Sequence, residues 1–161
     1  MFIAGTLLGA MKYKGLIPWD GDGDISIIHP GRMYNAGPWI DYLAARGIDA
    51  NMMVATYKDM TVDVMRWKTY TRRNNGVTEM YLYKFYPSSS QDSMIVRINH
   101  ELESFPLSWI EPRLRMNFYG KSVHIPNKWK QLLRKRYPIS LGFDLPYKWK
   151  CWIPRWTWMN G

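Results

Sequence analysis

The sequence is poor in cysteine and contains no long hydrophobic run. Its one cysteine, Cys151, excludes a disulfide within the chain and a cluster of thiolates around a metal ion. No stretch approaches the roughly 20 consecutive apolar residues that a membrane span needs, and no apolar run behind a charged N-terminus marks a signal peptide. His100 has no second histidine at ligand spacing, which argues against a zinc site. We therefore expect a globular chain with no disulfide, zinc site or transmembrane span.

Acidic residues are scarce relative to basic ones. The chain has 13 Asp and Glu against 22 Lys and Arg, which gives a formal net charge of +9. This balance favours phosphate-bearing or acidic ligands and carries no information about the fold. The basic residues are spread along the chain rather than gathered in one block, so we do not expect a nucleic-acid partner.

Length and composition indicate one domain over residues 1–161. Hydrophobic residues make up 47% of the chain, enough for a core at this size, and no repeat or low-complexity tract interrupts it. Residues 147–161 form a tail in which tryptophans are mixed with lysine and arginine. This tail could lie on a membrane interface, contact a glycan or cap the core.

Three aspartates at every second position form the most informative pattern of the sequence. Asp20, Asp22 and Asp24 are followed by the largely apolar segment Ile25–Ile28. In an extended chain, such alternate side chains point to one face, and successive Cα atoms lie about 6–7 Å apart. Carboxylates so close repel each other, and a hard divalent cation such as Mg²⁺ or Mn²⁺ relieves that repulsion. The pattern therefore predicts a metal-binding strand.

Two other interpretations fit a run rich in aspartate and glycine. It could be a solvent-exposed turn, which is the commoner outcome for such a run taken alone. It could also be a calcium-binding loop, but position six of that loop would be Ile25 and position twelve would be Gly31, where the loop needs glycine and glutamate. The apolar continuation favours a strand over both.

The segment before the aspartates resembles a family signature. Residues 5–24 are GTLLGAMKYKGLIPWDGDGD, and twelve of them agree with the pattern G-[ST]-L-L-G-A-x-R-x-x-x-x-I-P-W-D-x-D-x-D of the LicD family, which includes fukutin and fukutin-related protein. Lys12 stands where the family usually has arginine, and Gly23 where it usually has isoleucine or valine. Lysine keeps the charge but loses the bidentate fork of arginine, and glycine loosens the strand.

The resemblance implies a fold, an activity and partners. The implied fold is α+β, a nucleotidyltransferase-like mixed β-sheet flanked by helices, and the family's helical sequence upstream of the signature implies truncation at the N-terminus. LicD-like enzymes transfer a phospho-substituent, such as phosphocholine or ribitol phosphate, from a CDP-linked donor to a glycan and release CMP. The acceptor would be a glycan or a glycoprotein. The compartment would be the Golgi or secretory lumen in a eukaryote and the cytoplasm in a bacterium.

A short helix is expected over residues 6–14, just before the aspartates. Thr6 suits its N-cap and Gly15 its C-terminal stop. The backbone N–H groups of its first turn could hold a phosphate, so Gly5 and Thr6 are candidate substrate-binding residues. The alternative for these two residues is a plain helix cap. Lys12, at the family's arginine position, is a third candidate substrate contact.

A third carboxylate is predicted on a neighbouring strand over residues 61–67. Asp63 lies there between two valines, where a carboxylate is costly unless it meets a cation. The nucleotidyltransferase superfamily combines a Gly-[Gly/Ser/Thr] step, an Asp-x-Asp strand and a third acid, so the resemblance assigns Asp22, Asp24 and Asp63 to catalysis and metal binding. The alternative for Asp63 is an edge-strand residue turned to solvent. Arg66 on the same strand is a further candidate phosphate contact.

These residues together indicate a metal-dependent phosphotransferase. Asp22 and Asp24 would hold the Mg²⁺ at the donor phosphates, and Asp63 would complete the site and accept the proton of the attacking hydroxyl. Trp19 and Asp20 would support the turn before the strand. The alternative is a catalytically degenerate family member that acts as a binding or scaffold protein.

The other elements are expected in a mixed order typical of an α+β domain. Helices are expected over 38–46 and 128–136, and strands over 52–57, 78–86 and 94–98. Residues 105–126 resemble a second block of the family, with an F-P-L step, a turn at Gly120 and a strand that ends at Pro126. The aromatic side chains of 78–86 fit sheet packing or the stacking of a base or sugar. The basic face of 128–136 fits solvated surface or the steering of an anionic ligand.

Overall fold

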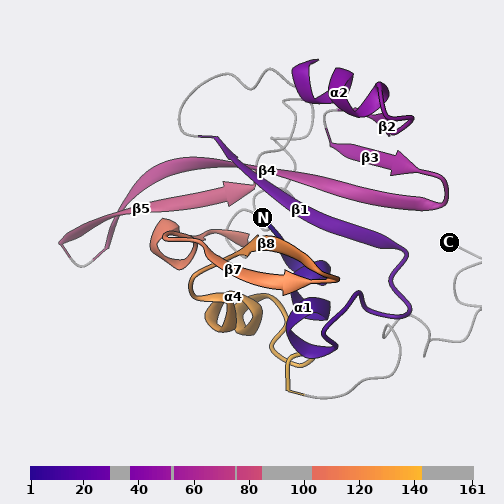
Figure 1. The fold of residues 1–161 in the computed structure, drawn as a ribbon. Helices are drawn as coiled ribbons and strands as arrows, with labels where there is room; N and C mark the ends of the chain where they lie inside the picture. The colour runs from indigo at the N-terminus through magenta and orange to yellow at the C-terminus, as the bar shows by residue number, and fades with distance from the viewer. Residues whose placement is uncertain (30–36, 52, 75, 85–102, 143–161) are drawn as a thin grey trace, which may run out of the picture.

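A six-stranded mixed β-sheet forms the centre of the fold (Figure 1). The computed structural model describes the chain except for residues 30–36, 52, 75, 85–102 and 143–161. The strands of the large sheet are β1 (Asp22–His29), β2 (Asp49–Ala50), β3 (Val54–Tyr57), β4 (Met60–Asn74), β5 (Val77–Lys84) and β6 (Phe105–Pro106). A separate hairpin pairs β7 (Leu114–Phe118) with β8 (Lys121–Ile125). The architecture is α+β, as expected.

The long strand β4 organises the sheet because it pairs with three other strands. Its first half lies parallel to β1 on one edge and antiparallel to β3 on the other, and its second half lies antiparallel to β5. β2 pairs with β3, and β6 pairs with β5. The sequence of β4 is rich in threonine, valine and aromatic residues, which suit a half-buried pleated surface.

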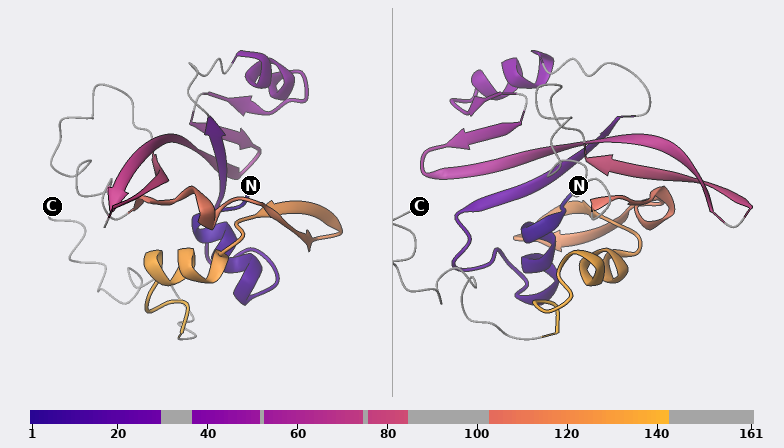
Figure 2. Two further views of the ribbon diagram at one scale, coloured as in Figure 1. Left: turned by 90° about the vertical axis from the view of Figure 1, so that its left-hand side faces the viewer. Right: turned by 180° about the vertical axis from the view of Figure 1, so that it is seen from behind.

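Helices α1 (Ala4–Lys12) and α4 (Trp129–Arg136) lie on one side of the large sheet, and α2 (Gly37–Ala44) lies apart from them beside β2 and β3 (Figures 1 and 2). A single 3₁₀ turn, η2 (Leu107–Trp109), follows β6. The core forms where the two helices meet the sheet, and its fully buried members include Leu7, Leu133, Trp67 and Leu82. Within the described residues, no helix is long and apolar enough to cross a membrane.

The alternation of β4 decides which side chains face this core. Met65 and Trp67 are buried in the cluster that contains the helix leucines, so every second residue of β4 points toward α1 and α4. Asp63 continues that row toward the start of the strand. The core face of the sheet therefore changes from apolar to acidic along β4, and this places Asp63 at the border of the core.

Helix α1 begins earlier than the sequence predicts. It covers Ala4–Lys12 rather than residues 6–14, its N-cap residue is Ile3, and no side chain caps it. The prediction of Thr6 as the N-cap is therefore wrong, because Thr6 lies inside the first turn and its hydroxyl serves another partner. The helix ends at Lys12 with Tyr13 as its C-cap, so the predicted stop at Gly15 is also wrong.

The predicted strands and helices of the rest of the chain are found with shifted ends. The strands predicted over 52–57, 61–67 and 78–86 correspond to β3, β4 and β5, and the helices over 38–46 and 128–136 correspond to α2 and α4. β4 extends beyond its predicted end to Asn74, because its second half gains β5 as a partner. The turn glycine of the β7–β8 hairpin is Gly120, with φ +75°, as predicted. The predicted strand 94–98 and the tail 147–161 lie outside the described residues.

The β7–β8 hairpin supports the segment that leads into β1. The Tyr119 hydroxyl, at the tip of the hairpin, accepts a hydrogen bond from the Leu16 N–H at 3.2 Å. At the other end of the hairpin, the carbonyl of His124 accepts one from the Phe2 N–H at 2.9 Å, and Phe2 itself forms an antiparallel bridge with Ile25 of β1. The small hairpin thus contacts the chain on both sides of α1, so the entry into the aspartate strand has a defined position.

Candidate active site

The first turn of α1 and the strand β1 are joined by two reciprocal hydrogen bonds. The backbone N–H of Thr6 donates to Oδ2 of Asp24 at 3.2 Å, and the backbone N–H of Asp24 donates to Oγ1 of Thr6 at 2.6 Å. Both residues are buried, with exposed fractions of 5% and 8%. The carboxylate of Asp24 therefore has a fixed position at the N-terminus of α1, where the helix dipole favours a negative charge.

Gly5 brings a second aspartate to the same place. A Cβ atom on Gly5 would lie 2.9 Å from Oδ2 of Asp20 and 2.9 Å from Oδ2 of Asp24, so a side chain at this position would displace a carboxylate. Ala4 before it has φ +50°, in the left-handed region that costs a non-glycine residue energy. The start of α1 is thus closely packed against two carboxylates, and Asp20 lies beside Asp24, while its supporting role stays a prediction.

The strand register places the three predicted ligands on one face of the sheet. Asp22 and Asp24 alternate along β1, and Asp24 is the direct partner of Asp63 on the parallel strand β4. Side chains of paired residues in neighbouring strands point to the same face, with about 4.8 Å between the strands. Within the described residues, however, no three Asp, Glu, His or Cys side chains are gathered closely enough to form a ready-made metal site. The backbone therefore brings the trio together, whereas the side chains do not converge.

The carboxyl group of Asp24 is electrostatically unusual. Burial raises its pKa above the ordinary value, the backbone N–H groups of Thr6 and Gly5 lower it, the charge of Asp22 raises it and the charge of Arg136 lowers it. A divalent cation beside this carboxylate would offset both the desolvation and the repulsion from Asp22. Oxygen ligands of this kind are those that Mg²⁺ and Mn²⁺ prefer. The residues present therefore fit such a cation.

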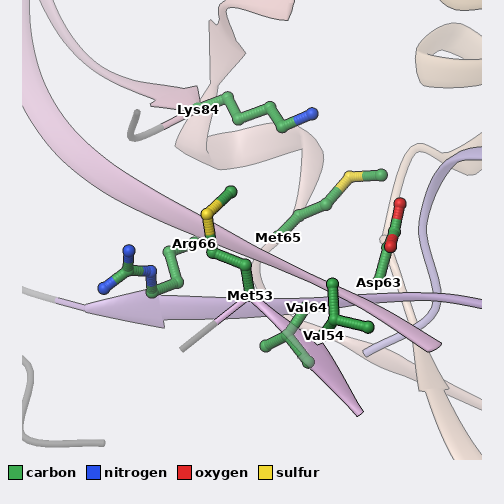
Figure 3. A pocket seen from close by; sticks show the side chains of 7 residues that line it. All are labelled: Met53, Val54, Asp63, Val64, Met65, Arg66 and Lys84. Atoms are coloured by element: carbon green, nitrogen blue, oxygen red, sulfur yellow. The ribbon is translucent and has the colours of Figure 1, made fainter. Parts of the chain in front are cut away.

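A pocket opens beside Asp63, where one edge of β4 passes from its partner β3 to its partner β5. It is lined by Met53, Val54, Asp63, Val64, Met65, Arg66 and Lys84 (Figure 3). Figure 3 shows the side chains of Asp63 and Arg66 at opposite ends of this lining, and the two residues belong to opposite faces of β4. The structure does not bring Arg66 to the aspartates, so its contact with a phosphate stays a prediction.

Lys12 and Trp19 lie away from the carboxylates. The Lys12 ammonium donates to the carbonyl oxygen of Ser140 at 2.7 Å. The backbone of Lys12 lies about 9 Å along the helix axis from that of Thr6. Trp19 packs edge-on against Tyr13, with the ring centroids 5.7 Å apart. The supporting role of Trp19 and a role of Lys12 in substrate binding both stay predictions.

A group of charged residues that the sequence did not reveal lies on the same face of the sheet. Lys84 is the pairing partner of Trp67, so its side chain points to the core face. Its ammonium lies 3.9 Å from Oε2 of Glu103, and the Nη2 atom of Arg136 lies 2.8 Å from Oε1 of the same glutamate. We call these three residues the Glu103 cluster. The predicted basic helix contained Arg136, but nothing in its spacing separates it from the exposed Arg134.

Tyr137, which follows Arg136, connects this cluster with the aspartates. Burial raises the pKa of its hydroxyl, Arg136 lowers it through its charge and a hydrogen bond, and the charges of Asp24 and Glu103 raise it. The same tyrosine therefore lies within electrostatic range of Asp24 and of the Glu103 cluster.

Comparisons with known proteins were made for the whole chain. Residues 1–128 match a family model described as LicD/FKTN/FKRP, nucleotidyltransferase domain. The chain is also similar to the mouse protein named ribitol 5-phosphate transferase FKRP, with 24% identity over 137 residues, an alignment that covers 83% of this chain and 26% of that protein. The chain thus spans about a quarter of the length of this relative.

Proposed function

The chain belongs to the LicD/FKTN/FKRP nucleotidyltransferase-domain family, and we propose that it transfers a phospho-substituent, of the polyol-phosphate or phosphocholine type, from a CDP-linked donor to a hydroxyl of a glycan or glycoprotein. The name of the mouse relative makes ribitol phosphate the first group to test. The observation that carries the proposal is the pairing of Asp24 with Asp63 on adjacent parallel strands, beside the N-terminus of α1.

The proposed reaction breaks one phosphorus–oxygen bond of the donor and forms another. The acceptor hydroxyl oxygen attacks the phosphorus atom of the transferred group, and CMP leaves with the bridging oxygen of the diphosphate. Asp63, the less buried partner of Asp24, accepts the proton of the hydroxyl at its carboxylate. Asp22, Asp24 and Asp63 would hold Mg²⁺ or Mn²⁺, which neutralises phosphate charge when bound.

Gly5 and Thr6 act in this proposal through Asp24. Thr6 fixes the carboxylate by the reciprocal hydrogen bonds, and Gly5 leaves the space that the carboxylates of Asp20 and Asp24 occupy. The first N–H groups of α1 already face a protein carboxylate, which separates this arrangement from a helix N-terminus that faces only solvent. Direct contact of Gly5 and Thr6 with a donor phosphate remains part of the proposal.

The proposal is tested by measuring CMP release from CDP-ribitol, CDP-choline and CDP-glycerol in the presence of glycan acceptors. We expect release that requires Mg²⁺ or Mn²⁺, stops with EDTA, and falls about 100-fold or more in Asp24→Asn and Asp63→Asn. Asp59→Asn is the matched control, because Asp59 is an exposed aspartate in the turn just before β4. The absence of release from every donor, or release indifferent to both site variants, contradicts a transferase.

The second candidate is a binding or scaffold protein that has lost catalysis. The observation in its favour is that no three acidic side chains converge within the described part of the chain. Such a protein would still bind a CDP-linked compound without releasing CMP. Calorimetric binding of CDP-ribitol, measured beside the release assay, separates the two candidates.

A further inference from the structure

Arg136 has the features of a ligand-binding residue on the core face of the sheet. It is the last residue of α4, and only 20% of its side chain is exposed. Lys84, which shares Glu103 with Arg136, lines the same pocket as Asp63, so the Glu103 cluster connects Arg136 with the candidate site. The charge of Arg136 also acts on Asp24 and Tyr137. An arginine in this position brings positive charge to the border of an acidic site, although α4 is far from β1 in the sequence.

Glu103 holds this arginine by one nitrogen, and the Tyr137 hydroxyl shares a further hydrogen bond with the guanidinium. The contact joins Nη2 of Arg136 to Oε1 of Glu103 at 2.8 Å, and the second oxygen of Glu103 faces Lys84 at 3.9 Å. The other terminal nitrogen, Nη1, is buried and has no hydrogen-bond partner among the described residues. A buried donor without a partner is unfavourable, and more so when it is charged. Glu103 therefore orients the guanidinium, and one N–H group remains available for a ligand.

The charges of the cluster favour an anion as that ligand. Lys84 and Arg136 are two cations that contact the same carboxylate, Glu103. Guanidinium groups bind phosphate oxygens through strong, directional hydrogen bonds. A diphosphate placed between the aspartates and this cluster would have a metal ion on one side and a guanidinium on the other.

We propose that Nη1 of Arg136 donates a hydrogen bond to the diphosphate of the nucleotide donor, and that Glu103 positions Arg136 for this contact. This inference rests on the proposed function, since it assigns a binding residue to the same site. It adds Glu103 to the site and gives a defined contact to one arginine of α4, the helix whose basic face fits the steering of an anionic ligand. A purely structural role, in which Arg136 only fastens α4 to Glu103, is the competing explanation.

Binding of CDP, CMP and pyrophosphate to the full 161-residue chain distinguishes the two explanations. The variants are Arg136→Gln and, as the matched control, Arg134→Gln, an exposed arginine on the same helix. We expect Arg136→Gln to weaken CDP and pyrophosphate binding about tenfold or more, to weaken CMP binding less, and to reduce the preference for CDP over CMP. Arg134→Gln should change each affinity less than about twofold.

Each result has a defined meaning. Equal losses for CDP and CMP, or no loss in Arg136→Gln, overturn the assignment of Arg136 and leave the transferase proposal standing. Pyrophosphate binding that depends on Arg136, without CDP binding, supports the anion site and contradicts a CDP-linked donor. If the wild type binds none of the three compounds, the assignment and the donor proposal both fall.

A conservative variant covers the case in which Arg136→Gln does not fold. Arg136→Lys keeps the charge opposite Glu103 but has a single nitrogen, so it can keep the ion pair or reach the ligand, not both. We expect it to fold, as judged by circular dichroism and thermal unfolding, and to lose several-fold in CDP affinity with a smaller loss for CMP. Wild-type affinity for CDP in this folded variant would show that the guanidinium fork is not needed.

Discussion

Thr6 and Asp24 exchange two buried hydrogen bonds across 18 positions of the sequence. Each residue donates through its backbone N–H and accepts through a side-chain oxygen. If either side chain loses that oxygen, the backbone N–H of the other residue stays without a partner. The pair joins the helix that begins the family signature to the strand that ends it. The signature is therefore a packing unit as well as a set of candidate catalytic residues.

Replacement of Thr6 by valine tests how much this pair of hydrogen bonds contributes to stability. Valine has the shape of threonine but cannot accept the hydrogen bond of the Asp24 N–H, which would stay buried without a partner. We expect Thr6→Val to lower the free energy of unfolding by about 1–3 kcal/mol, measured by urea denaturation. Thr6→Ser keeps the hydroxyl and should cost less than Thr6→Val. A larger loss in Thr6→Ser than in Thr6→Val would mean that the methyl group contributes more to the pair than the hydrogen bond does.

Replacement of two glycines by alanine should have opposite effects on stability. Gly5→Ala would place a Cβ 2.9 Å from two carboxylate oxygens, so we expect lower stability and loss of metal-dependent CMP release, despite the higher helix propensity of alanine. A Cβ on Gly23, the second residue of β1, would lie 3.5 Å from a methyl carbon of Val62, an ordinary contact. Gly23→Ala should therefore stabilise the fold by roughly 0.5–1 kcal/mol. Thermal unfolding of both variants checks the signs, and a stabilised Gly5→Ala would contradict the packing described for α1.

The pH dependence of stability should change when Asp24 is neutralised. Burial is the main reason that the pKa of Asp24 is raised in the folded state, so protonation of this carboxyl group stabilises the fold. This contribution is complete below the ordinary pKa of the carboxyl group and is lost as the pH rises through the raised value. The variant Asp24→Asn has no such pH-dependent contribution to lose. Its free energy of unfolding, relative to that of the wild type, should therefore increase from acidic to neutral pH. Urea denaturation across that range measures the difference, and a difference independent of pH would contradict the burial of the charge.

A double-mutant cycle tests the contact of the β7–β8 hairpin with the segment before β1. A Cβ on Gly15 would lie 2.5 Å from the Tyr119 hydroxyl oxygen. We expect Gly15→Ala to cost about 0.5–1.5 kcal/mol of unfolding free energy in the wild type, because it displaces the hydroxyl of this exposed side chain from the Leu16 N–H. The cost should be clearly smaller in the background Tyr119→Phe, where the oxygen is absent. Additive effects of the two substitutions would show that the hairpin does not contact this segment.

Part of the site could be predicted from local pattern alone. The two-residue period of Asp22 and Asp24, and the position of Asp63 between valines, follow from strand geometry, and the structure places all three on one face. The pairing of Asp24 with Asp63 depends on strand register, which local sequence does not encode. Thr6 was predicted as a cap because threonine favours that position, but Asp24 offers its hydroxyl a buried partner instead.

The charged residues around Glu103 show where sequence reasoning ends. Arg136 is one of several basic residues on α4, and only tertiary packing separates it from exposed Arg134. The extension of β4 to Asn74 has the same origin, since it depends on β5 lying alongside. Burial separates Arg136 from Arg134, and pairing with β5 extends β4. Neither effect leaves a periodic pattern in the sequence.

The pairing of β4 with near and distant partners has a consequence for folding. Its antiparallel neighbours β3 and β5 are close to it in sequence, whereas the parallel neighbour β1 returns across a long connection that includes α2. Closing a long connection costs more entropy, so we expect the β3–β4–β5 meander to form first and β1 to dock late. Substitutions in β1 should then change the unfolding rate more than the folding rate. The aspartate face would come into existence only in the last step of folding, and it would be the first part of the sheet to disappear when the chain is stressed.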